Sequence, residues 1–440
     1  MPVTVGIYTL GCKVNQYESE AIAERFTERG FSVQSASLPC DVYVINTCTV
    51  TAESDRKARQ FIRRAKKQNP ASYLLVTGCF SQTNPHAVAA IEGVDYVCGN
   101  ACKLSVVAEA EQLVARGQKN PEASILDIAP DSCGFEQMSI TRFDRTRAYV
   151  KIEDGCESRC TYCIIPAARG RIRSKAPSDV LREVRTLTEN GCREIVLTGI
   201  ETASYGKDLD GYSLADLLEE IDRIQNIGRI RLGSLDPSLM KQDFVDRIAT
   251  LHSLAPHFHL SMQSGSDRIL ALMKRKYNTK QALEGIRRLR DAIPNLNLTT
   301  DMIVGFPQET EEDFAKSVAF AKEANFLMIH VFPYSKRAGT LAATMEGQIA
   351  EAVKHERVHI LSQVAQDVRK DILDRMTGNV YEVLTETYDA PNAYGHTDGF
   401  VEVAFPLKDF EHAKTVCVRI TGNNGDLCFG EPIISSKGDA

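Results

Sequence analysis

The chain has 440 residues, which is too long for one typical domain, so we expect two or three, each with a core of its own. Its 43% hydrophobic and 25% charged residues are ordinary values for a globular protein. A formal net charge of -6 excludes a uniformly basic nucleic-acid binder, so any contact with RNA must depend on local patches.

The cysteine count and the N-terminal stretch indicate the compartment. Thirteen cysteines, an odd number in a long chain, do not suit a disulfide framework and indicate a reducing environment. The N-terminal stretch lacks a basic region followed by a long apolar region, and no apolar run is long enough to span a bilayer. We therefore predict a cytoplasmic protein without a membrane partner.

The first third of the sequence repeats a strand, a cysteine and a helix three times. The alternation predicts a doubly wound parallel α/β domain over residues 1–120. The cysteines that follow the three strands are Cys12, Cys48 and Cys79. Ligands of such sheets bind at the carboxyl ends of the strands, so these cysteines should meet at one edge. Singly, each is more often a small buried residue, but together they indicate a metal cluster with one open iron.

Two further features of the first third of the sequence can be explained without a functional site. The helix after Cys48 is strongly basic, which is typical of a solvated face but also suits a track for RNA phosphates. Cys98 and Cys102 form a C-x-x-x-C pair that we interpret as structural or incidental, because the pair lacks the position after a strand.

A second cysteine trio follows the strand-like residues 148–152. Cys156, Cys160 and Cys163 have the spacing C-x-x-x-C-x-x-C. Three thiolates on one short loop can each bind one iron of a cubane cluster, and the missing fourth ligand leaves one iron open to a small molecule. Structural zinc sites have four protein ligands, so the trio argues against zinc.

After a less patterned link over residues 120–147, strands and helices alternate again for more than two hundred residues. The strands that we expect are Tyr149–Ile152, Glu194–Leu197, Arg229–Leu232, His257–Leu260, Leu298–Val304 and Leu327–Val331. Six parallel strands predict a central open partial (β/α)6 TIM-type barrel over residues 142–376.

Polar residues follow these strands, at the end of the barrel where function gathers. The candidates for binding a zwitterion with an attached nucleoside are Glu201, Ser234, Asp236, Gln263 and Ser264. Lys336 and Arg337 suit an anion, and Arg169 suits a carboxylate or an RNA phosphate. For any single residue, an ordinary turn or cap is an equal alternative.

The last segment changes pattern after a long helix over residues 348–376. Short alternating strands with Asn, Asp and Gly turns predict a small C-terminal antiparallel β-barrel over residues 377–440. Such barrels often bind single-stranded RNA on exposed aromatic rings, for which Tyr388, Tyr394 and Phe400 are candidates.

This order of features resembles the methylthiotransferase family of radical S-adenosylmethionine (SAM) enzymes along essentially the whole chain. The stretches that carry the resemblance are residues 9–18, 46–50, 77–79, 163–170, 301–307 and 332–337. The resemblance implies that Cys156, Cys160 and Cys163 hold a SAM-cleaving 4Fe-4S cluster. It also implies that Cys12, Cys48 and Cys79 hold an auxiliary 4Fe-4S cluster, and that the C-terminal barrel is a TRAM-like RNA-binding domain.

Within the family, the sequence is most similar to the enzymes that convert N6-threonylcarbamoyladenosine at position 37 of tRNA, next to the anticodon, to its 2-methylthio derivative. These enzymes use one SAM as methyl donor and a second as radical source. The resemblance further implies a monomer, a reductant such as flavodoxin or ferredoxin, and a sulfur donor. The alternatives are N6-isopentenyladenosine in tRNA, an aspartate of a ribosomal protein, or a non-enzymatic iron-sulfur protein that binds RNA.

Overall fold

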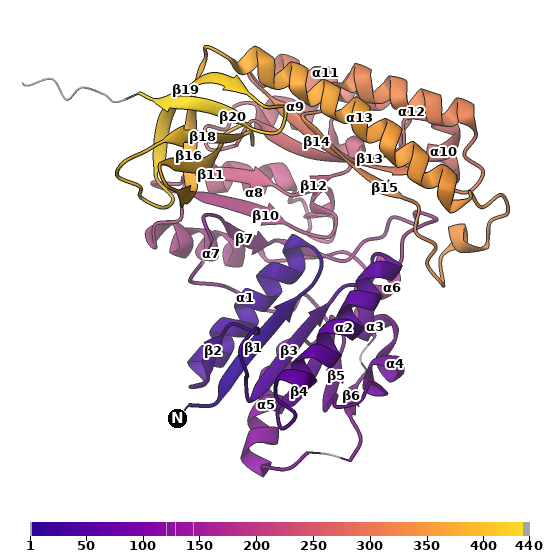
Figure 1. Cartoon of the computed structure of the whole chain (residues 1–440), viewed down its shortest axis with the longest axis vertical. Helices are drawn as coiled ribbons and strands as arrows, with labels where there is room; N and C mark the ends of the chain where they lie inside the picture. The colour runs from indigo at the N-terminus through magenta and orange to yellow at the C-terminus, as the bar shows by residue number, and fades with distance from the viewer. Residues whose placement is uncertain (1, 120, 128, 144, 434–440) are drawn as a thin grey trace, which may run out of the picture.

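The computed structural model describes residues 2–119, 121–127, 129–143 and 145–433. Three units follow one another along the chain (Figure 1). An N-terminal α/β unit, drawn in indigo and purple, packs against a central barrel, and a small all-β unit, drawn in yellow, lies at the far side of that barrel. No helix in the described part of the chain is both long and apolar enough to cross a membrane.

The N-terminal unit is a parallel sheet with the strand order β2-β1-β3-β4-β5-β6. Its strands are β1 (Thr4–Thr9), β2 (Ser32–Gln34), β3 (Val42–Thr47), β4 (Tyr73–Gly78), β5 (Tyr96–Cys98) and β6 (Ser124–Leu126). Its helices are α1 (Lys13–Glu28), α2 (Ala52–Gln68), α3 (Cys79–Thr83), α4 (Pro85–Ala89) and α5 (Ser105–Arg116). The sheet extends past the boundary expected at residue 120, because β6 pairs with β5.

The central unit contains the six predicted parallel strands as β7 (Ala148–Lys151), β10 (Glu194–Thr198), β11 (Arg229–Leu232), β13 (His257–Gln263), β14 (Asn297–Val304) and β15 (Met328–Pro333). A short seventh strand, β12 (Ser234–Leu235), follows β11 after Gly233. β11 pairs with β10, whereas β12 pairs with β13. The open barrel therefore bends at Gly233, whose N–H donates to the carbonyl of Leu197 at 2.8 Å.

Helices cover the outside of this barrel. They are α7 (Pro177–Glu189), α8 (Leu214–Asp222), α9 (Gln242–Ile248), α10 (Asp267–Leu272), α11 (Thr279–Ala292), α12 (Glu311–Ala324) and α13 (Glu351–Met376), with short α6 (Ile165–Arg169) after the cysteine loop. Short β8 (Glu153–Asp154) and β9 (Arg173–Ser174) pair on either side of that loop. Tyr17 and Ala21 of α1 belong to the barrel core, so the first two units share a buried interface.

The C-terminal unit is a closed barrel of five strands, where the sequence pattern predicted three. They are β16 (Val380–Asp389), β17 (Asn392–Thr397), β18 (Glu402–Pro406), β19 (Thr415–Asn423) and β20 (Cys428–Pro432). The pattern missed β17 and β20, which are short and contain Gly, Asn or Pro. Its core includes side chains of α13, which ties this barrel to the central unit.

Candidate active site

The three N-terminal cysteines lie at one edge of the sheet. Cys12 directly precedes α1, Cys48 follows β3, and Cys79 opens α3 after β4. The pairing of Thr9 with Asn46, and of Thr47 with Gly78, brings the ends of the three strands to nearly the same level. Parallel pairing therefore gathers ligands that lie about thirty residues apart in the sequence.

Two glycines make this approach possible. Gly11 has φ +102°, and a Cβ there would lie 2.8 Å from the Cβ and 3.0 Å from the Sγ of Cys48. Gly78 has the same φ, and a Cβ there would lie 2.4 Å from the carbonyl oxygen of Thr47. Burial and the neighbouring thiol of Cys79 raise the pKa of Cys48 to about 11. Three neighbouring thiols fit a metal cluster, because the binding of iron offsets the free energy that it costs to deprotonate thiols close to one another.

The second trio lies on the loop between β8 and α6. The N–H of Cys163 donates to the carbonyl of Cys160 at 3.1 Å, which keeps this loop tight. Cys156 donates to Oε2 of Glu201 at 3.0 Å, and Arg275 donates to Sγ of Cys160 at 3.2 Å. Burial raises the pKa of Cys163 to about 11. The three thiols again fit an iron-sulfur cluster. The carboxylate of Glu201 and the guanidinium of Arg275 would then contact the ligand sulfurs from outside the cluster.

A cavity of about 540 Å³ lies at the second trio and reaches the loop after Cys48, although none of Cys12, Cys48 and Cys79 lines it. All three cysteines of the second trio line it, and so do Val50 and Thr51 from the loop after Cys48. Four of the five residues that we expected to contact SAM line this cavity: Glu201, Ser234, Asp236 and Gln263. The fifth, Ser264, does not, because its fully buried hydroxyl lies 3.4 Å from that of Ser317 on α12.

Sequence reasoning missed two cavity residues. Arg275 donates to Oδ2 of Asp236 at 2.7 Å and to the carbonyl of Ser261 at 3.0 Å. It stands between two other basic residues, Lys274 and Lys276, so nothing in the sequence singles it out. Phe332 at the end of β15 is 46% exposed and lines the cavity, where its ring offers a stacking surface.

The expected anion-binding role of Arg169 is wrong. Its side chain is fully buried and donates to Glu18 and to Asn15, each at 2.6 Å. Glu18 also pairs with Lys151 at 2.7 Å and with Lys103. This buried network connects α1 to the segments flanking the second trio, so it fixes one cysteine region relative to the other.

Arg337 is also engaged rather than free for an anion. It donates to the hydroxyl of Thr49 at 2.7 Å and to Oδ2 of Asp55 at 2.8 Å. Both partners follow Cys48 closely in sequence, so the loop after β15 is tied to the first cysteine region. Lys336 is exposed and makes no ion pair among the described residues.

The three aromatic candidates of the C-terminal barrel differ in their surroundings. Tyr388 is 42% exposed and stacks on Phe410 with the ring centroids 5.3 Å apart. Phe400 instead stacks between His257 and His396 with centroids 4.8 Å from each, so it belongs to the contact with the central unit. Tyr394 is only partly exposed.

Comparisons with known proteins agree with this architecture. The profile of the radical SAM superfamily matches residues 150–321, and the profile described as "Uncharacterized protein family UPF0004" matches residues 4–99. A solved radical SAM methyltransferase, TsrM from Kitasatospora setae, is 16% identical with a TM-score of 0.59 over 78% of this chain and 77% of that one. At this identity the likeness shows the fold alone.

Curated relatives match nearly the whole chain. "Threonylcarbamoyladenosine tRNA methylthiotransferase MtaB" of Bacillus subtilis is 41% identical over 95% of this chain and 93% of the relative. The protein of the same name from Thermotoga maritima is 38% identical over 99% and 98%. A "tRNA-2-methylthio-N(6)-dimethylallyladenosine synthase" of Methylacidiphilum infernorum is 35% identical over 99% and 96%.

Proposed function

This chain belongs to the tRNA methylthiotransferases of the radical SAM superfamily, and from that membership we propose that it converts N6-threonylcarbamoyladenosine at position 37 of tRNA to its 2-methylthio derivative. One SAM serves as methyl donor and a second as radical source. Two 4Fe-4S clusters belong to this chemistry, one at Cys156, Cys160 and Cys163 and an auxiliary one at Cys12, Cys48 and Cys79. When bound, they supply the electron for SAM cleavage and the sulfur for insertion.

The observation that carries the proposal is a cavity that is lined by the second cysteine trio and by the loop after Cys48. It holds the second trio on one wall and the loop after Cys48 on another. A base bound in this cavity would lie beside the second trio and the loop that follows Cys48. An unpaired base of a loop can enter such a cavity without the cost of opening a duplex.

Side chains of the cavity have separate parts in binding. The carboxylates of Glu201 and Asp236 suit the amino group and ribose hydroxyls of SAM, and the side chains of Ser234 and Gln263 add hydrogen-bonding groups on the same wall. Arg275 holds Asp236 in place through their ion pair. The exposed ring of Phe332 offers a surface on which the target adenine can stack.

Contact with the rest of the tRNA is assigned to two surfaces. The C-terminal barrel, as a TRAM-like domain, presents the exposed ring of Tyr388, which stacks on the partly buried Phe410. The basic helix α2 begins four residues after Cys48 and suits the phosphates of the anticodon arm. The reaction also needs a reductant, such as flavodoxin or ferredoxin, and a sulfur donor, and we place it in the cytoplasm.

A second candidate is N6-isopentenyladenosine in tRNA. The observation that favours it is the 35% identity over nearly the full length to a protein named for the dimethylallyl nucleoside. The 41% identity to a protein named for the threonylcarbamoyl nucleoside favours the first candidate.

The experiment that tests the proposal separates the two cysteine regions. Purified protein with reconstituted clusters is incubated anaerobically with SAM, a reductant and tRNA. The tRNA carries N6-threonylcarbamoyladenosine without the methylthio group at carbon 2. Cys160→Ala should abolish 5′-deoxyadenosine formation, whereas Cys48→Ala should retain some SAM cleavage and form no methylthiolated nucleoside. Cys417→Ala, an exposed cysteine of the C-terminal barrel, is the control. Methylthiolated tRNA from the Cys48 variant would contradict the assignment of the auxiliary site.

A further inference from the structure

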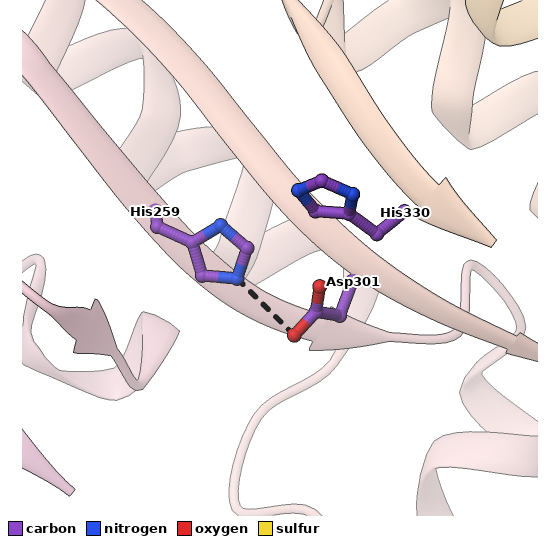
Figure 2. A group of neighbouring side chains, drawn as sticks. All are labelled: His259, Asp301 and His330. Atoms are coloured by element: carbon purple, nitrogen blue, oxygen red, sulfur yellow. Dashed lines mark ion pairs between the residues drawn. The ribbon is translucent and has the colours of Figure 1, made fainter. Parts of the chain in front are cut away.

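A separate group of possible metal ligands lies inside the barrel, apart from both cysteine trios. It consists of His259 on β13, Asp301 on β14 and His330 on β15 (Figure 2). One ligand atom from each side chain lies within 4.8 Å of the ligand atoms of the other two. Figure 2 shows the three side chains extending from neighbouring strands into the same space.

The strand register explains why these side chains meet. Asp301 pairs with His330, and His259 pairs with Thr299, two residues before Asp301. Paired residues of parallel strands share a face, as do residues two apart on one strand, so all four side chains share one face. Asp301 lines the cavity, and Ile303, two residues further on, does so too. This face is therefore the inside of the barrel, and the group rests on rigid strands rather than on a loop.

One histidine is held in a defined orientation. Nε2 of His259 lies 3.2 Å from Oδ2 of Asp301, and its Nδ1 lies 3.0 Å from Oγ1 of Thr299. Thr299 is 3% exposed, and its hydroxyl also lies 3.2 Å from Nε2 of His257. A partner on the second ring nitrogen is typical of histidines that bind metals, because it fixes the ring and leaves the other nitrogen directed at the ion.

We propose that His259, Asp301 and His330 bind one divalent transition-metal ion through two imidazole nitrogens and one carboxylate oxygen. This donor set suits Zn²⁺, Fe²⁺ or Mn²⁺, and three protein ligands leave coordination positions open. The open positions face the cavity, because Asp301 lines it and His330 is exposed to solvent. The donors are nitrogen and oxygen, so this site is distinct from the thiolate sites of the two clusters.

The alternative interpretation of this group is an ion pair between His259 and Asp301, with His330 nearby but without a role. That reading accounts for His259 and Asp301 but leaves His330 unexplained, since within the described chain its imidazole makes no hydrogen bond. One feature opposes cation binding: the ammonium of Lys13, at the start of α1, acts electrostatically on Asp301 and His330.

The test measures the zinc content of the holoprotein, in which both trios of cysteines bind their iron-sulfur clusters. Wild type and variants are dialysed anaerobically against Zn²⁺ buffered by a weak chelator, and bound zinc and iron are measured by mass spectrometry. His330→Ala should bind one zinc fewer per chain than the wild type, with unchanged iron. His359→Ala, which removes an exposed histidine from α13, is the matched control and should behave as the wild type.

If His330→Ala does not fold, two variants that preserve side-chain volume test the same proposal. Asp301→Asn and Thr299→Val should each weaken zinc binding about 10- to 100-fold. X-ray absorption at the zinc edge should show only nitrogen and oxygen neighbours at about 2.0–2.2 Å. Equal zinc content in the wild type and in folded variants, or sulfur around the zinc, would overturn the proposal. It stands apart from the proposed tRNA chemistry, so either can fail without the other.

Discussion

At the scale of single residues, the buried carboxylate of Glu18 organises the contact between the first two units. Burial alone would raise the pKa of Glu18, but Arg169, Lys103 and Lys151 together hold it well below its usual value. A depressed pKa means that this stabilisation is present above the pKa of the unfolded chain and is lost as the pH falls. All three cations are buried, and Asp154 also pairs with Lys151 and Arg169. Lys103 has its ion pair with Glu18.

Glu18→Gln should therefore destabilise the protein strongly. Removing one partner of a buried ion pair leaves uncompensated charges and costs about 3–5 kcal/mol. Glu28→Gln, on the same helix, breaks an exposed pair with Arg25 and should cost about 0–1 kcal/mol. The measurement is the urea midpoint of the holoprotein near neutral pH. Equal midpoints for the two variants would refute the importance of the network.

A second residue-scale prediction concerns the cation beside Cys160. Arg275 places a guanidinium 3.2 Å from the sulfur of Cys160, and a positive charge there favours the reduced, more negative form of a cluster. Arg275→Met should give that cluster a more negative midpoint potential and slower SAM cleavage. Lys276→Met, an exposed neighbour, is the control. Redox titration followed by electron paramagnetic resonance checks this, and an unchanged potential would count against it.

At the scale of elements, the loop after β15 depends on α2 for its position. Arg337 connects this loop to Thr49 and Asp55, next to Val50 and Thr51 of the cavity wall. Arg337→Ala should leave SAM cleavage largely intact but lower the yield of methylthiolated tRNA per 5′-deoxyadenosine, because the two walls are no longer held together. Lys336→Ala removes an exposed charge from the same loop and should keep the wild-type ratio. A ratio unchanged in both variants would contradict this role.

The elements themselves were largely predictable from periodicity and caps. The start of α12, for example, follows a Thr-x-x-Asp pattern that is typical of a capping box, and Thr310 and Asp313 are bonded reciprocally. The bend of the barrel at Gly233 was not predictable, because it depends on a tertiary hydrogen bond to Leu197. The same holds for β6, a strand of three residues whose pattern is too short to distinguish from a loop.

At the scale of the whole molecule, the sequence predicted where Cys12, Cys48 and Cys79 lie better than it predicted the partners of the surrounding charges. Strand order alone predicts that these three cysteines meet at one edge of the sheet, and the pairing of β1, β3 and β4 confirms it. Arg169 and Arg337 were misread because the sequence does not say which acid a base will meet once α1 and α2 pack against the barrel. The group around His259 was missed for the same reason, since its members come from three strands.

The measurement that tests the central claim most directly is mass spectrometry of nucleosides from total tRNA of cells with and without this protein. We predict that deletion removes 2-methylthio-N6-threonylcarbamoyladenosine and that its precursor without the methylthio group accumulates. Complementation with the wild type, but not with Cys160→Ala, should restore the modified nucleoside. If that nucleoside persists in the deletion strain while the isopentenyl counterpart disappears, the assigned substrate is wrong; if neither changes, so is the assignment to tRNA.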